Sequence, residues 1–99
     1  MKNGYLGTRK RGTKMKSFTH TIIDSLGIHA RPAGQIVTEA KKFSSAIMID
    51  TGEKKASATK LMAVMALGVK CGQSVTVTAE GEDEDAAIAS MQQFFAANL

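Results

Sequence analysis

Two histidines are the first residues of this 99-residue chain to consider for group-transfer chemistry. His20 lies in an alternating segment, where its side chain is expected to face the core at the edge of a sheet. His29 lies in a turn two residues after Gly27. Pro32 favours a helix start directly after this turn, because proline suits the first helical turn. A turn residue held by a rigid scaffold is well placed for function, so His29 is the candidate reactive residue.

The start of this helix is predicted to bind phosphate. The free N–H groups of a first helical turn point outward, and the helix dipole adds about half a positive charge there. Arg31 adds a planar guanidinium that matches phosphate oxygens. Imidazole is a good nucleophile near neutral pH, and phosphoryl transfer needs mainly in-line positioning and charge neutralisation. The residues therefore predict phosphoryl transfer through His29, and the plainer alternative is that His29 is an ordinary capping or surface residue.

The hydrophobic pattern around this site predicts alternating strands and helices. Strand-like alternation covers residues 17–23, and helical spacing follows over about residues 30–42. The later expected elements are strands over 46–50 and 54–57, a short helix from Leu61 that Gly68 closes, a strand over 73–79, and a last helix. The order β-α-β-β-α-β-α predicts an α+β open-faced β-sandwich, with a four-stranded, mostly antiparallel sheet and three helices on one face.

Charge and composition divide the chain into a short leader and one domain. Residues 1–14 contain five of the 13 basic residues and no acidic residue, whereas residues 15–99 are close to neutral. We expect residues 1–14 to be a disordered basic leader or tail, and residues 15–99 to form one domain. The leader lacks the interleaved aromatic residues that stack on bases, so we expect no nucleic-acid partner.

Several other site classes are disfavoured by the residues themselves. No apolar run approaches the roughly 18 residues of a membrane span, so we expect no membrane insertion. Cys71 is the single cysteine and zinc ligand pairs are absent, which favours a reducing cytosol. The acidic run over residues 80–85 lacks the ligand spacing of a calcium loop and is predicted to be a solvated helix cap.

Three segments resemble the HPr family, the histidine-containing phosphocarriers of the bacterial sugar phosphotransferase system. Residues 26–33, Leu-Gly-Ile-His-Ala-Arg-Pro-Ala, look like the family's active-site segment. Residues 61–68 are similar to its short second helix, and residues 75–84 resemble its last strand and the start of its last helix. The resemblance covers about residues 15–99 and leaves out the leader.

The resemblance implies a role for each residue that matches the family motif. His29 would be phosphorylated at Nδ1, and Arg31 would steady the phosphoryl group and its transition state. The backbone N–H groups of Ala30 and Arg31 would help to hold the oxygens. An apolar docking patch beside the site would comprise Leu61, Met62 and Met65.

Two parts of this picture have plainer alternatives. Leu61 and Met65 share a stripe and fit an ordinary core role equally well, whereas Met62 falls off that stripe and is expected to be exposed. Lys60 stands where many Gram-positive members carry a regulatory serine. Because the family's serine kinase cannot phosphorylate lysine, we expect no serine switch, and an ordinary solvated residue at the helix start is the equal alternative.

The resemblance also implies partners and a compartment. It implies a cytoplasmic carrier that accepts a phosphoryl group from enzyme I, itself charged by phosphoenolpyruvate, and passes it to enzyme IIA domains for sugar uptake. We expect a monomer that is not a self-sufficient catalyst and that needs no metal or organic cofactor. The alternatives are a regulatory HPr-like protein that binds a transcription factor or metabolic enzyme, a nitrogen-branch carrier, and a plain α+β interaction module.

Overall fold

A computed structural model of the protein describes residues 16–99, and the predicted leader over residues 1–14 lies outside this range. In chain order the elements are β1 (Lys16–Thr21), α1 (Ala30–Ala40), β2 (Ala46–Asp50), β3 (Lys55–Ser57), α2 (Leu61–Ala66), β4 (Ser74–Glu80) and α3 (Glu84–Asn98). This order confirms the prediction, although α1 ends two residues earlier than expected. No helix in the described range is long and apolar enough to cross a membrane.

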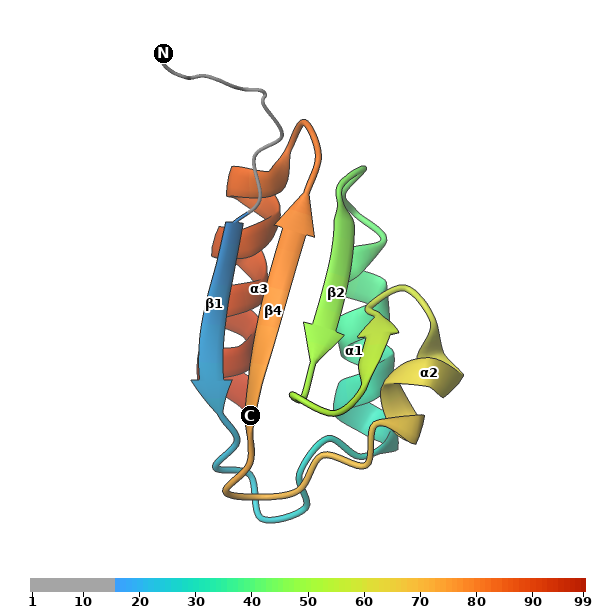
Figure 1. Ribbon diagram of the computed structural model, residues 1–99, viewed down its shortest axis with the longest axis vertical. Coiled ribbons are helices and arrows are strands. Elements are labelled where there is room, and N and C mark those ends of the chain that lie inside the picture. The colour runs from blue at the N-terminus through green and yellow to red at the C-terminus, as the bar shows by residue number, and fades with distance from the viewer. Residues whose placement is uncertain (1–15) are drawn as a thin grey trace.

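The four strands form one antiparallel sheet in the order β1-β4-β2-β3. The helices lie on one side of this sheet, with α1 and α3 behind it and α2 beside β3 (Figure 1). The predicted open-faced α+β sandwich is therefore confirmed. The loop between β1 and α1 and the loop between α2 and β4 run together at one end of the molecule (Figure 1).

The core lies between the sheet and the two long helices. Its fully buried members follow the predicted periods, with alternate residues of β4 and every third or fourth residue of α1 and α3 facing inward. They include Val75, Val77, Ala79, Ala33, Ile36, Ala40, Ala87, Met91 and Phe95. His20 is half-buried on β1, which confirms its expected place, and its ring meets that of Phe95 edge-on with 5.7 Å between centroids.

The acidic run before α3 is more than a solvated cap, and here the prediction was wrong for two residues. Asp83 accepts hydrogen bonds from the backbone N–H groups of Ser44 and Ser45, each at 2.9 Å, and a short one from the Ser45 hydroxyl. Glu84 is only 6% exposed, and its Oε1 accepts from the N–H of Gly81 at 3.1 Å. Asp83 therefore ties the start of α3 to the loop before β2, and Glu84 closes the turn between β4 and α3.

Candidate functional site

Backbone hydrogen bonds hold the loop that precedes α1 in one conformation. Gly27 has a positive φ of 68°, and its N–H donates to the carbonyl of Asp24 at 2.9 Å. The next residue, Ile28, is buried, and its N–H donates to the carbonyl of Val69 at 3.1 Å. The backbone just before His29 is therefore anchored both to its own turn and to the loop after α2.

His29 occupies the N-cap position of α1 without acting as a side-chain cap. Its backbone is extended, with φ −100° and ψ −173°, and its carbonyl accepts the N–H of Ala33 at 3.0 Å. The imidazole makes no capping hydrogen bond and is half-buried. The alternative that this histidine is present to cap the helix is therefore wrong, and the ring remains available for chemistry.

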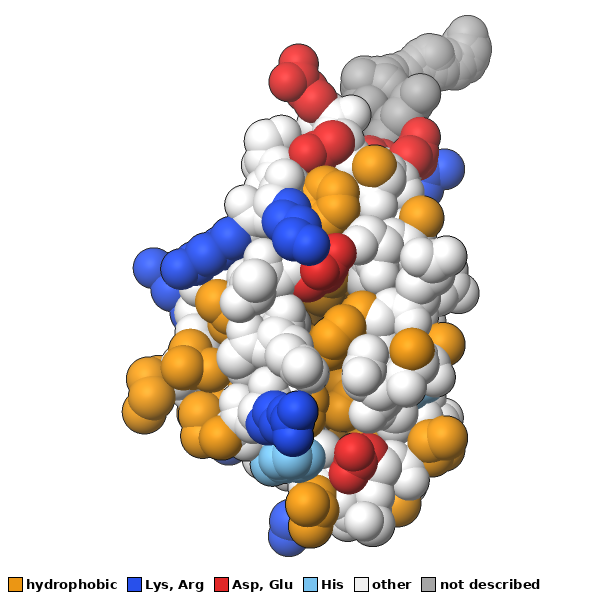
Figure 2. Space-filling model, turned by 180° about the vertical axis from the view of Figure 1, so that it is seen from behind, with side chains coloured by type: hydrophobic (Ala, Val, Ile, Leu, Met, Phe, Trp, Pro, Cys, Tyr) orange, Lys and Arg blue, Asp and Glu red, His pale blue; other side chains and the backbone are white. Residues whose placement is uncertain are grey.

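His29 and Arg31 line one open hollow of about 270 Å³. Arg31 is exposed and has no ion pair or side-chain hydrogen bond to another described residue. The N–H groups of Ala30 and Arg31 belong to the first helical turn, where no acceptor exists within the helix. Figure 2 shows a histidine side chain at the surface here, beside a basic side chain and with an acidic one to its right.

The three residues of the expected docking patch are all exposed on α2. Met62 is 76% exposed, as predicted, while Leu61 and Met65 are 41% and 39% exposed. The alternative that Leu61 and Met65 are ordinary core residues is therefore wrong. Val64 is the residue of α2 that enters the core.

Sequence comparison agrees with this geometry. The family described as "PTS HPr component phosphorylation site" matches residues 16–97. The chain belongs to the HPr family. It is 48% identical to the phosphocarrier protein HPr of Lysinibacillus sphaericus over 77 aligned residues. The alignment covers 78% of this chain and 88% of that protein. Like other HPr proteins, it carries a phosphoryl group in the phosphotransferase system.

Solved HPr structures have the same fold. The histidine-containing phosphocarrier protein of a Mycoplasma superposes with a TM-score of 0.81 at 40% identity, covering 83% of this chain and 93% of that one. An HPr dimer from Thermoanaerobacter tengcongensis matches with a TM-score of 0.67 at 40% identity, covering 83% and 94%.

Three further polar side chains line the HPr hollow, and the sequence did not predict them as part of the site. Gln35 follows Arg31 by one helical turn, a spacing that could have revealed it. Asp24 comes from the turn between β1 and α1, and Asn98 comes from the far end of α3. No local pattern signals Asn98, because only the packing of α3 beside α1 brings it here.

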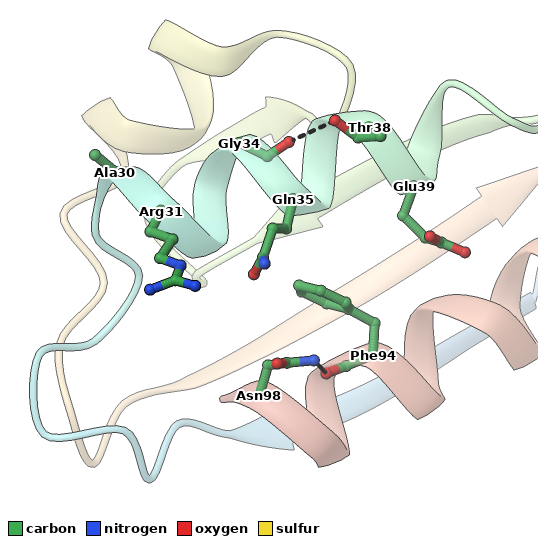
Figure 3. Close-up of a pocket in the computed structure, with 8 residues that line it drawn as sticks. All are labelled: Ala30, Arg31, Gly34, Gln35, Thr38, Glu39, Phe94 and Asn98. Carbon is green, nitrogen blue, oxygen red and sulfur yellow. Dashed lines mark hydrogen bonds between the residues drawn. The ribbon is translucent and has the colours of Figure 1, made fainter.

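The hollow continues into a groove of about 680 Å³ between α1 and α3. Figure 3 shows Arg31 and Gln35 pointing from α1 into this space, with Phe94 and Asn98 on the α3 side. Gly34 also lines the groove, and a Cβ at this position would meet nothing within 4 Å. The glycine at this position therefore leaves open space beside the helix.

Lys60 occupies the N-cap position of α2, where the regulatory serine of many Gram-positive members is expected to align. It is exposed and makes no side-chain capping hydrogen bond. Its neighbour Thr59 is half-buried, and its hydroxyl lies 2.9 Å from that of Ser57. The hydroxyl nearest to Lys60 in sequence is thus already engaged within the chain.

Proposed function

We propose that His29 is the residue that carries the phosphoryl group. The observation that supports this most strongly is that the imidazole sits at the start of α1, makes no capping hydrogen bond and shares a hollow with Arg31. A phosphoryl group on this ring would meet the exposed guanidinium and the first-turn N–H groups of Ala30 and Arg31. These groups are the donors that phosphate oxygens require.

The proposed step exchanges one N–P bond for another. The lone pair of Nδ1 of His29 attacks phosphorus in line with the N–P bond of a phosphohistidine on the donor. That bond breaks, the donor ring recovers its electron pair, and each ring keeps the proton on its other nitrogen. Arg31 and the helix N-terminus offset the negative charge on the three transferred oxygens throughout.

Enzyme I is the proposed donor and enzyme IIA domains are the proposed acceptors, in the cytoplasm. The exposed patch of Leu61, Met62 and Met65 supports such docking, because methionine-rich apolar surfaces adapt to several partners in turn. Contacts of about 1,200 Å² or less suit such transient exchange. We propose that the carrier acts as a monomer, relies on these enzymes for catalysis and needs no cofactor.

The test is phosphorylation by phosphoenolpyruvate and enzyme I, followed by intact mass and acid treatment. The wild type should gain one acid-labile phosphate, and His29→Ala should gain none. His20→Gln is the matched control, because it removes the other histidine of the chain and should retain the phosphate. Phosphate that persists in His29→Ala would overturn the proposal. Adding IIA domains of the sugar and nitrogen branches separately would identify the branch.

A regulatory role without phosphate transfer is the second candidate, and the free positions of His29 and Arg31 argue against it. A regulator that never carries phosphate does not need a guanidinium without an ion pair in the described range, beside an imidazole that makes no capping hydrogen bond. We also propose that the serine switch is absent, because Lys60 has no hydroxyl. Incubation with the family's serine kinase and ATP should add no phosphate; a gain on Thr59 would contradict this.

A further inference from the structure

The hollow that holds His29 is also lined by an acidic residue, which phosphate binding alone does not explain. Asp24 lines it together with His29 and Arg31, and the other lining side chains, Pro32, Gln35 and Asn98, are uncharged. Asp24 forms no ion pair with a lysine or arginine of the described range. A pure phosphate receptor would exclude an acid from this position, because like charges repel.

Asp24 is held in place by its own backbone and side chain. Its Oδ1 accepts the N–H of Leu26 at 2.8 Å, and its carbonyl accepts the N–H of Gly27 at 2.9 Å. Its own N–H donates to a main-chain oxygen of Leu99 at 3.0 Å. The residue is half-buried, so the carboxylate is part of the anchored turn and cannot swing freely away from the hollow.

We propose that Asp24 is a positioning residue that raises the phosphoryl-transfer potential of His29. This inference rests on the proposed phosphorylation of His29. A phosphoryl group brings a charge of about −1.5 to −2 into the hollow. Arg31 and the helix N-terminus lower the free energy of this state, and the Asp24 carboxylate raises it, whereas the unphosphorylated state feels no such repulsion.

The balance matters because a carrier must release the group as readily as it accepts it. Cationic groups alone would make the phosphorylated carrier too stable to pass the group on. The carboxylate of Asp24 opposes this, and so it favours cleavage of the N–P bond at His29. Its charge is therefore expected to shift each transfer equilibrium toward the unphosphorylated carrier.

The test compares Asp24→Asn with wild type in the equilibrium between phosphorylated enzyme I and the full-length carrier. The asparagine keeps Oδ1 as the acceptor for Leu26, so the turn is retained while the charge is lost. We expect an equilibrium constant for carrier phosphorylation about three- to tenfold larger. This equilibrium constant depends on the free energies of the two separate proteins with and without the phosphoryl group, and not on how they dock. Altered affinity for enzyme I therefore cannot produce this change.

Asp50→Asn is the matched control. Asp50 makes the same local bond, from its Oδ1 to the N–H of Gly52 at 2.7 Å, but it does not line the hollow. The Asp50→Asn variant should change the equilibrium constant for carrier phosphorylation less than twofold. The difference between Asp24→Asn and wild type should also shrink in 1 M salt, where the screening length is about 3 Å.

Two outcomes separate this inference from the proposed function. If wild type is phosphorylated on His29 but Asp24→Asn has an unchanged equilibrium constant, the inference on Asp24 fails and the proposed function stands. If the wild type is not phosphorylated on His29, the proposed function fails first. An equal change in Asp24→Asn and Asp50→Asn would also overturn the inference, because it would show a general charge effect.

Discussion

Gly27 and Val69 are in direct backbone contact across two loops. A Cβ placed on Gly27 would lie 2.2 Å from the carbonyl oxygen of Val69, which is the oxygen that accepts the N–H of Ile28. The loop before α1 can thus approach the loop after α2 only because residue 27 has no side chain. This contact fixes the position of the loop that leads to His29 relative to the loop after α2.

Gly27→Ala is expected to destabilise the fold and to disturb the site. The positive φ of 68° alone costs a non-glycine residue about 1–2 kcal/mol, and the contact with Val69 adds to this. Denaturant unfolding should show the loss, and phosphorylation of His29 should slow. Gly34→Ala is the control, because its Cβ has free space; it should stabilise α1 by up to about 1 kcal/mol. Equal stabilities for the two variants would contradict this view.

Arg31→Ala is expected to slow phosphoryl transfer while the fold stays intact. Loss of a charge-assisted hydrogen bond to the phosphoryl group corresponds to roughly a ten- to hundredfold lower rate. The free energy of unfolding should change by less than about 0.5 kcal/mol, since Arg31 is exposed and contributes nothing to the core. Rapid-quench phosphorylation by enzyme I measures the rate. A large drop in melting temperature would show that the arginine has a structural role.

Met62→Gln is expected to weaken docking without weakening the fold. The side chain is 76% exposed, so its replacement by a polar one of similar length should leave the free energy of unfolding within about 0.5 kcal/mol of wild type. The KM for the carrier in the enzyme I reaction should rise several-fold. Met62→Leu retains the apolar surface and should behave like wild type. If neither variant changes KM, Met62 lies outside the interface.

We predict that ionisation of Asp83 makes the free energy of unfolding depend on pH. The hydrogen bonds from the Ser45 hydroxyl and the Ser44 N–H lower the pKa of Asp83 below its ordinary value. A carboxylate with a lowered pKa in the folded state contributes stability above its unfolded pKa of about 3.9 and loses it as the pH falls through the folded value. Urea unfolding of wild type and Asp83→Asn should therefore differ at pH 6 and converge toward pH 2. A difference that is constant over this range would show that ionisation of Asp83 is not involved.

Removal of residues 1–14 is expected to change neither stability nor phosphorylation. Residues 1–14 come before the start of β1 in the sequence, whereas the loop that leads to the proposed site follows the end of β1 (Figure 1). A chain that starts at Met15 should match the full chain in melting temperature and in its rate of phosphorylation by enzyme I. A marked loss of either would assign the leader a function.

The central residues of the proposed site could be predicted from the sequence, because they lie within one short segment. A turn glycine, a histidine, an arginine and a proline within six residues specify a helix start, and a helix start already supplies free N–H groups and a positive dipole. The alternating and helical periods likewise determined the order of the elements, because each period reports which face of one segment meets the core.

Tertiary structure alone decided which distant residues share the site. Asn98 enters the hollow, Val69 meets Gly27, and Asp83 reaches Ser45 only through packing between segments far apart in the chain. Exposure of Leu61 and Met65 was also undetermined, since an apolar stripe on a six-residue helix fits a core or a surface equally well. Such contacts leave no period in the sequence, because they depend on how whole elements are placed against one another.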